Sequence, residues 1–281
     1  MKNYYLFDLL VHREKTAPII KSARKLFEIL AVDAPSFKEA KGDVGSEYMS
    51  LDKLKFLERN AYNLSFAAEA GRDIICIEQS SLISLAHTKE LIEADQQLKF
   101  EMAQRLEKYN LKLNLNLDVI SLEQFLVDVF GLEKLSSFIK RPFSNFQAAL
   151  FLGSQACRAK KYRKEATLDA VLKTLSLTCV KHTSQYESDG FEVLDASALL
   201  AKKLASNVML DMFDHAADFI LVSDARSFVM FDHYQKELEK LVGRDLGLGI
   251  LSLPELLVLA CGENDKKSIG LDQHAVPVTL I

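Results

Sequence analysis

The chain has 281 residues, of which 49% are apolar and 26% charged, a composition typical of a globular protein rather than a disordered one. Its net charge of −4 and its pI of about 5.9 give no broad electrostatic reason to bind nucleic acid or an anionic membrane. The sequence has neither a signal-peptide pattern nor an apolar run long enough to cross a bilayer, so we expect a cytoplasmic protein that is not transmembrane.

Strand and helix patterns alternate along the first half of the chain. Residues 4–11 predict a short strand, and residues 73–77 form a continuous apolar run, typical of a strand buried on both faces of a parallel sheet. Apolar residues at helical spacing predict helices over residues 18–30, 51–70, 82–109 and 121–130.

The pattern restarts after Arg141-Pro142-Phe143-Ser144, which predicts a boundary between two domains, residues 1–143 and 144–281. The second half has predicted strands over residues 148–153, 219–223 and 249–253. Its predicted helices cover residues 166–175, 196–215, 228–242 and 254–260.

The two halves repeat one pattern. Residues 67–76 and 214–222 each read as a helix end, a short turn, an Asp and a buried strand, followed by a polar loop and another helix. Such units predict an α/β fold: two tandem, pseudo-two-fold related α/β domains with short, mainly parallel sheets flanked by helices. Ligands of such sheets bind at the carboxyl ends of the strands, which is where both polar loops stand.

Several segments together resemble one family. They are residues 122–135 followed by Arg141-Pro142, the turn at residues 151–155, the helix at 232–239, and the C-terminal stretches 250–262 and 270–274. The resemblance covers nearly the whole chain and is to the B subunit of heterodisulfide reductase, a family that includes the E-type subunit of non-classical succinate dehydrogenase. It implies two tandem cysteine-rich domains, each with a Cys after its first strand, a Cys-Cys-Gly loop, and a C-x-x-C loop after a later strand.

The chain departs from this family at the cysteines that hold its iron–sulfur clusters. In the first half the corresponding residues are Asp8, Asp43 and Val44 before Gly45, and then Glu78 and Ser81. In the second half they are Ser154, Ser188 and Asp189 before Gly190, and then Asp224 and Ser227. Iron–sulfur clusters need thiolate ligands. We therefore expect no cofactor, no metal site and no catalytic residue at these former cluster-loop positions.

Three functions follow from this comparison. The first is a cluster-less, non-catalytic pseudo-enzyme that serves as a structural or interaction subunit, with the subunits of a redox complex as its implied partners. The second is a binding module whose former cluster cavities hold a cation or a small polar ligand. The third is an enzyme that uses the carboxylates for acid–base chemistry. The sequence indicates neither a particular partner nor an oligomeric state.

Three other groups of residues can each be interpreted as a functional site or as an ordinary structural feature. Asp211, Asp214 and His215 share a helix face and could touch a metal, although a solvated helix surface is favoured. The pair Asp232-His233 could serve acid–base chemistry, although a helix start is favoured. The basic run 158–164 could hold a phosphate or an acidic partner, although a solvated loop is favoured.

Overall fold

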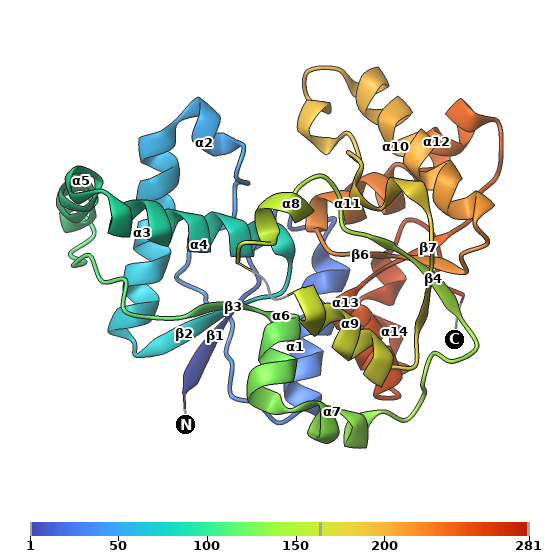
Figure 1. Cartoon of the computed structure of the whole chain (residues 1–281), viewed down its shortest axis with the longest axis horizontal. Coiled ribbons are helices and arrows are strands. Elements are labelled where there is room, and N and C mark those ends of the chain that lie inside the picture. The colour runs from blue at the N-terminus through green and yellow to red at the C-terminus, as the bar shows by residue number, and fades with distance from the viewer. Residues whose placement is uncertain (1, 163–164, 280–281) are drawn as a thin grey trace.

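The computed structural model of the chain describes residues 2–162 and 165–279 and contains two short parallel sheets (Figure 1). The first has the strand order β1-β2-β3, with β1 at Asn3–Phe7, β2 at Arg72–Cys76 and β3 at Val119–Ser121. Every pairing in it is parallel. The apolar run of β2 lies at the centre, between two neighbours, as its pattern predicted.

The second sheet has the order β5-β4-β6-β7 and is also entirely parallel. Its strands are β4 at Gln147–Phe151, β5 at Thr178–Val180, β6 at Phe219–Val222 and β7 at Gly249–Ser252. Figure 1 shows α10, α11 and α12 on one side of this sheet and α9, α13 and α14 on the other. The predicted fold class, α/β with short parallel sheets flanked by helices, is confirmed.

Several helices agree with the predicted ranges to within a few residues, but the helix predicted over residues 82–109 is two helices divided at Asp95. In the first half they are α1 Ala17–Ile29, α2 Tyr48–Leu51, α3 Lys53–Glu69, α4 Gln79–Ala94, α5 Gln96–Glu107, α6 Leu122–Gln124 and α7 Leu132–Phe138. In the second half they are α8 Ala156–Ala159, α9 Glu165–Thr174, α10 Ala198–Asp214, α11 Ala225–Phe228, α12 Gln235–Val242, α13 Leu253–Ala260 and α14 Lys266–Ile269.

Two predicted helices contain turns of π-helix. The helix predicted over residues 121–130 continues from α6 into a π-helix at Phe125–Phe130. The helix predicted over 228–242 is divided into α11, a π-helix at Val229–His233, and α12. Apolar spacing alone does not distinguish a π-helical turn from an α-helical one, because both keep apolar residues on one side over a single turn.

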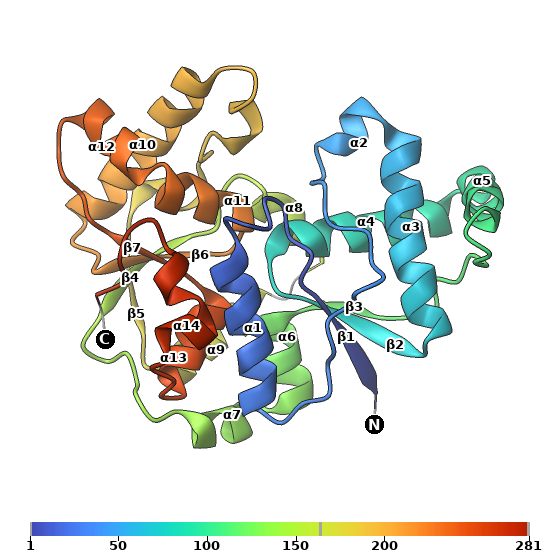
Figure 2. The same cartoon turned by 180° about the vertical axis from the view of Figure 1, so that it is seen from behind.

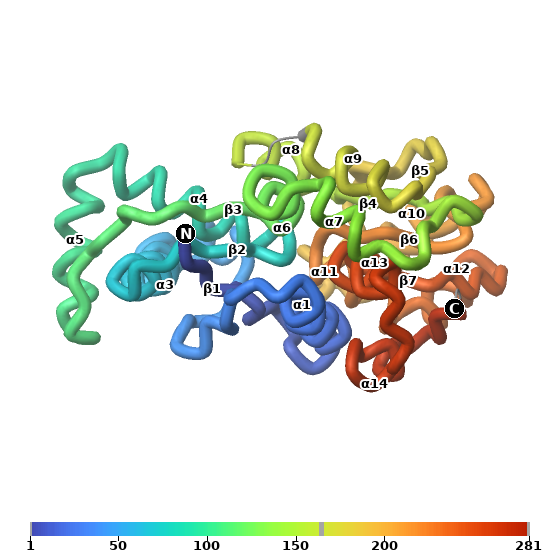
Figure 3. The backbone as a smooth tube through the Cα atoms, turned by 90° about the horizontal axis from the view of Figure 1, so that it is seen from below, coloured from blue at the N-terminus to red at the C-terminus, as the bar shows by residue number. Residues whose placement is uncertain are grey.

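The largest hydrophobic core runs through both halves. It contains Leu6 and Ile19 from the first half together with Leu221 and Leu256 from the second. Helix α1 packs against α13, and Figures 2 and 3 show it lying beside the helices of the second half. The boundary predicted after residue 143 lies in a connection between α7 and β4, and the division into two pseudo-symmetric domains remains a prediction.

Candidate functional site

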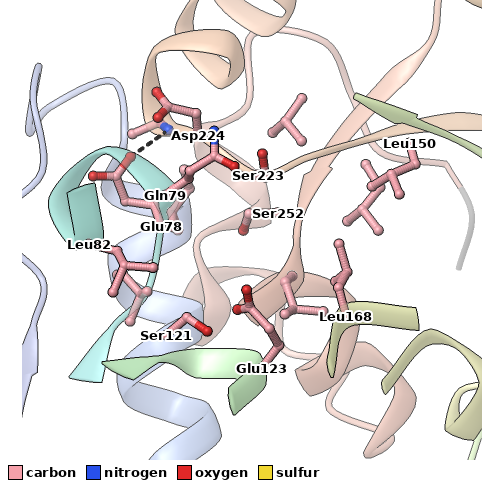
Figure 4. Close-up of a pocket in the computed structure, with 16 residues that line it drawn as sticks. Glu78, Gln79, Leu82, Ser121, Glu123, Leu150, Leu168, Ser223, Asp224 and Ser252 are labelled. Atoms are coloured by element: carbon pink, nitrogen blue, oxygen red, sulfur yellow. Dashed lines mark hydrogen bonds between the residues drawn. The ribbon is translucent and has the colours of Figure 1, made fainter. Parts of the chain in front are cut away.

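Two polar loops, one from each half, meet where their strands end. Glu78 follows β2 and begins α4, and Asp224 follows β6 and begins α11. Two backbone amides join the loops: the amide of Ala225 donates to Glu78 Oε2 over 3.1 Å, and the amide of Gln79 donates to the carbonyl of Ser223 over 3.0 Å. Figure 4 shows Glu78, Gln79, Ser223 and Asp224 close together. We call this region, residues 78–81 and 223–227, the seam site.

Glu78 is buried in an environment that favours its protonated form. Its Oε1 accepts from the Ser81 amide over 2.9 Å and is also in contact with the Ser81 hydroxyl. Burial, together with the nearby carboxylates of Asp224 and Asp43, raises the pKa of Glu78 to about 8. Glu78 therefore keeps its proton to a higher pH than an exposed glutamate does.

Asp224 is the second buried carboxylate of the seam site. Its Oδ1 accepts from the Arg226 amide over 3.0 Å, and burial raises the pKa of the carboxyl against the lowering effect of the Arg226 charge. Asp224 Oδ2 and Gln79 Oε1 have no hydrogen-bond partner within residues 2–162 and 165–279. Both residues line a cavity of about 30 Å³, which has room for a water-sized occupant (Figure 4).

Arg226 supplies the positive charge of the seam site. Its Nη1 lies 2.6 Å from Glu47 Oε1, and its Nη2 donates over 2.9 Å to Ser80 Oγ, which donates in turn to Asp43 Oδ2 over 2.9 Å. The guanidinium lies against Gly45, where an added Cβ would be 2.0 Å from Nη2. The loop that carries Asp43 therefore has a glycine where the guanidinium needs the space.

The corresponding loop of the second half is tied to the start of α11. Asp189 accepts from Ser227 Oγ over 2.5 Å and from the Phe191 amide over 2.9 Å, and burial raises its pKa to about 6. Gly190 has a φ of +79°, and a Cβ there would be 2.3 Å from the carbonyl oxygen of Ala201. This turn therefore requires glycine both for its conformation and for its contact with α10.

Two serines of the second half, Ser154 and Ser188, share one hydrogen-bond acceptor close to the loop of Asp189. The hydroxyls of Ser154 and Ser188 both donate to Glu192, over 3.3 and 3.2 Å. Four predicted positions of the second half line one small cavity beside Gln79 and Arg226: Ser154, Asp189, Asp224 and Ser227. The two predicted groups therefore do not form separate sites in separate halves, because residues of the first half reach into the second.

Asp8 and Val44 have contacts of their own. Asp8 is buried, and its Oδ2 accepts from Arg24 Nε and from Ser36 Oγ, each over 2.6 Å. The pairing of β1 with β2 ends at Phe7, and the carbonyl of Leu9 accepts from the Asp43 amide over 2.9 Å, so the chain after Asp8 runs along the loop of Asp43. Val44 is partly buried and packs against an apolar cluster that includes residues of α3 and α5. A functional role for these positions remains a prediction.

The seam site does not fit an iron–sulfur cluster, because its donors are carboxylates, hydroxyls, amides and a guanidinium. Cys76 is the cysteine nearest in sequence to it, and burial raises the pKa of that thiol well above its usual range. No group of three or more His, Cys, Asp or Glu side chains suited to a metal occurs in the described residues. Asp211 instead accepts from the Thr183 and Ser184 amides, and Asp214 pairs with Arg244.

Sequence reasoning missed a buried ionic network near the C-terminus. His274 has its Nε2 2.6 Å from Glu255 Oε1 and its Nδ1 3.3 Å from Asp232 Oδ1, and all three side chains are closed to solvent. The two carboxylates raise the pKa of His274 to about 10 against the opposing effect of burial. Asp232 also accepts from the Ala275 amide, so it anchors the C-terminal segment instead of starting a helix with His233.

Comparison with known proteins gives two kinds of sequence match. Residues 191–275 match the family described as the HdrB-like C-terminal domain. The 8-methylmenaquinol:fumarate reductase membrane anchor subunit of Wolinella succinogenes is 24% identical over 240 residues, which cover 83% of each chain. The B subunit of the ferredoxin/F(420)H(2)-dependent CoB-CoM heterodisulfide reductase of Methanosarcina acetivorans is 26% identical over 280 residues, covering 92% of this chain and 89% of that one.

A solved structure shares the fold. The crystal structure of a hypothetical protein from Helicobacter pylori superimposes with a TM-score of 0.82 and 22% sequence identity. The match covers all of this chain and 53% of that one, so the chain spans about half the length of this relative. No helix within the described residues is long and apolar enough to cross a bilayer.

Proposed function

The chain belongs to the family of the heterodisulfide reductase B subunits, and on this premise we propose that it is a cluster-less, non-catalytic member that serves as a structural or interaction subunit of a redox complex. The relatives are named as subunits of a heterodisulfide reductase and of a fumarate reductase, and this supports a role within an assembly. All four cysteines are free thiols, which is consistent with the cytoplasm as the proposed location.

One observation carries this proposal: the seam site is built from hydrogen-bonded carboxylates and hydroxyls around the Arg226 guanidinium. Hard oxygen donors and a fixed cation do not replace the thiolates that an iron–sulfur core needs. Glu47 and Ser80 contact Arg226 directly, and Ser80 donates in turn to Asp43. Several positions that the family resemblance assigns to cluster ligands therefore belong to a hydrogen-bonded polar network in this chain.

The test is reconstitution with iron and sulfide under anaerobic conditions, with the Methanosarcina acetivorans relative treated in parallel as the positive control. We expect the chain to remain colourless, with iron far below one atom per molecule, while the control gains the absorbance of its clusters. In the native host, affinity purification of the chain should recover redox subunits in fixed ratio. Stoichiometric iron with a broad absorbance near 400 nm would contradict the cluster-less assignment.

A second function, a binding module for a cation or a small polar ligand, has its own observation in favour. Asp224 Oδ2 and Gln79 Oε1 are buried acceptors without a partner in the described part of the chain, and they line the same small cavity. A cation would satisfy both. Titration calorimetry with Na⁺, K⁺, Mg²⁺ and Ca²⁺ tests this function, and a heat signal that is lost in Asp224→Asn would support it over a purely structural role.

A further inference from the structure

A second and much larger cavity lies away from the seam site, between helices of the two halves. Its volume is about 410 Å³, within the range of pockets that bind small organic molecules. One wall comes from α2, α3 and α4, and the other from α8 and the turn after it. Figure 1 shows α8 beside α4 at this position.

The first wall contributes apolar side chains. Met49 comes from α2, Phe56 from α3 and Ile83 from α4. Met49 is the partly exposed one, while Phe56 and Ile83 are buried behind it and hold this wall in place. An apolar lining of this kind gains free energy by removing a ligand's hydrocarbon from water.

The opposite wall is basic. Arg158 and Lys161 line the cavity together with His87 and Tyr162, and none of the residues lining the cavity is acidic. These two cations belong to the basic run 158–164, whose residues Arg163 and Lys164 lie outside the described residues. The side chains of Arg158 and Lys161 are both exposed, and part of this solvated run forms one wall of the open cavity.

Hydrogen bonds in this wall decide how much charge is left for a ligand. Lys161 is paired with Glu90, whose Oε2 also accepts from the Tyr162 hydroxyl over 2.7 Å. That hydroxyl is 2.9 Å from His87 Nδ1 and, because it donates to Glu90, it accepts from the imidazole. The charge of Lys161 is therefore largely compensated.

Arg158 is the cation without such compensation. Its Nη1 lies 3.4 Å from the hydroxyl of Ser46, and no carboxylate pairs with it within residues 2–162 and 165–279. A guanidinium offers two parallel N–H donors that match the two oxygens of a carboxylate. One uncompensated cation beside an apolar surface suits a monoanion with a hydrocarbon body better than a compact dianion such as phosphate.

We propose that this cavity binds a small organic carboxylate, with the carboxylate on Arg158 and the apolar part against Met49 and the ring of Tyr162, in front of the buried Phe56 and Ile83. The site does not depend on the proposed function, because none of these residues belongs to the seam site. The ligand would contact both halves of the chain, and it would stabilise the fold by an amount that grows with the logarithm of its concentration divided by its Kd.

The test is titration calorimetry of the full chain with octanoate, 1-octanol and inorganic phosphate as probes. We expect octanoate to bind, with 1-octanol and phosphate each at least about tenfold weaker, because each lacks one of the two interactions. Arg158→Gln should weaken octanoate by at least about tenfold while leaving 1-octanol unchanged. Arg13→Gln is the matched control, since Arg13 is exposed and does not line the cavity.

A second variant separates binding from folding. Ser50→Trp places a large side chain at the exposed rim of the cavity without altering the core, and it should abolish octanoate binding while leaving the melting temperature within a few degrees of the parent. Absence of octanoate binding at millimolar concentration, equal affinity for octanoate and 1-octanol, or unchanged affinity in both variants would each overturn the proposal.

Discussion

His274 Nε2 lies 2.6 Å from Glu255 Oε1 in a site closed to solvent, and this contact fastens the C-terminal segment to α13. The imidazole has a second carboxylate, Asp232, 3.3 Å from its other nitrogen. Burying a charge is costly unless it is paired, so the three groups stabilise the fold only as a set.

The free energy of unfolding should fall in alkaline solution because of His274. Its pKa rises from an ordinary value of 6.5 to about 10 on folding, so its contribution is complete below pH 6.5 and is lost as the pH rises through 10. We expect the loss to be on the order of 3 kcal/mol, measured by urea unfolding at pH 6, 8 and 10. His274→Gln should be less stable at pH 6 and should show a flatter profile. Parallel profiles for the two proteins would contradict this assignment.

Replacing Glu78 should stabilise the protein, whereas replacing His274 should destabilise it. Its folded pKa of about 8 lies above the ordinary 4.5, so folding takes up a proton and stability declines as the pH rises from 4.5 to 8. Glu78→Gln cannot ionise, and its one oxygen accepts from either the Ala225 or the Ser81 amide, so a pH-independent cost accompanies the pH-dependent gain. We expect the variant to gain stability relative to the parent between pH 5 and pH 9, by roughly 1–3 kcal/mol in urea unfolding. A constant difference across this range would show that Glu78 is already ionised in the fold.

Removing the buried cation of the seam site should be costly. In Arg226→Met, the carboxylates of Glu47 and Asp224 lose the charge that faces them, and we expect a loss of about 3–5 kcal/mol in the free energy of unfolding. The control is Arg244→Met, whose ion pair with Asp214 is half-exposed and should contribute less than about 1 kcal/mol. Similar losses in the two variants would mean that Arg226 acts as an ordinary surface charge.

Gly45 and Gly71 form a matched pair for the contact with Arg226. Both have a positive φ, of +83° and +64°, so alanine at either position carries a backbone cost of about 1 kcal/mol. Only at Gly45 would the new Cβ meet the guanidinium, since nothing lies within 4 Å at Gly71. We therefore expect Gly45→Ala to lower the melting temperature clearly more than Gly71→Ala. Equal shifts would show that Arg226 can move away without loss.

The parts of the fold that the sequence predicted well are those with a local signal. Strands β2 and β6 are continuous apolar runs, and Glu78 and Asp224 stand directly after them. Strands β3 and β5 escaped prediction because each has three residues and lies at the edge of its sheet, so neither is long enough to show a periodic pattern.

The candidate site was predicted in part for a similar reason. Topology places the ends of parallel strands at one edge of a sheet, which marks Glu78 and Asp224 as candidates, whereas Asp43 and Ser81 were grouped with them only through the family resemblance. The pairing of Asp8 with Arg24, and that of His274 with Asp232, depend on how distant segments pack, and no local pattern encodes such contacts. The same holds for the meeting of Gln79 with Ser223 across the two halves.

The shared core of α1 and α13 has a consequence for how the protein folds. Helix α1 is made early and α13 near the end of the chain, yet each buries apolar side chains in the same cluster. Neither half can complete that cluster alone, so we expect heat to unfold the whole protein in a single cooperative transition. During synthesis, the apolar face of α1 stays uncovered until α13 has left the ribosome, and over that interval the nascent protein is open to aggregation.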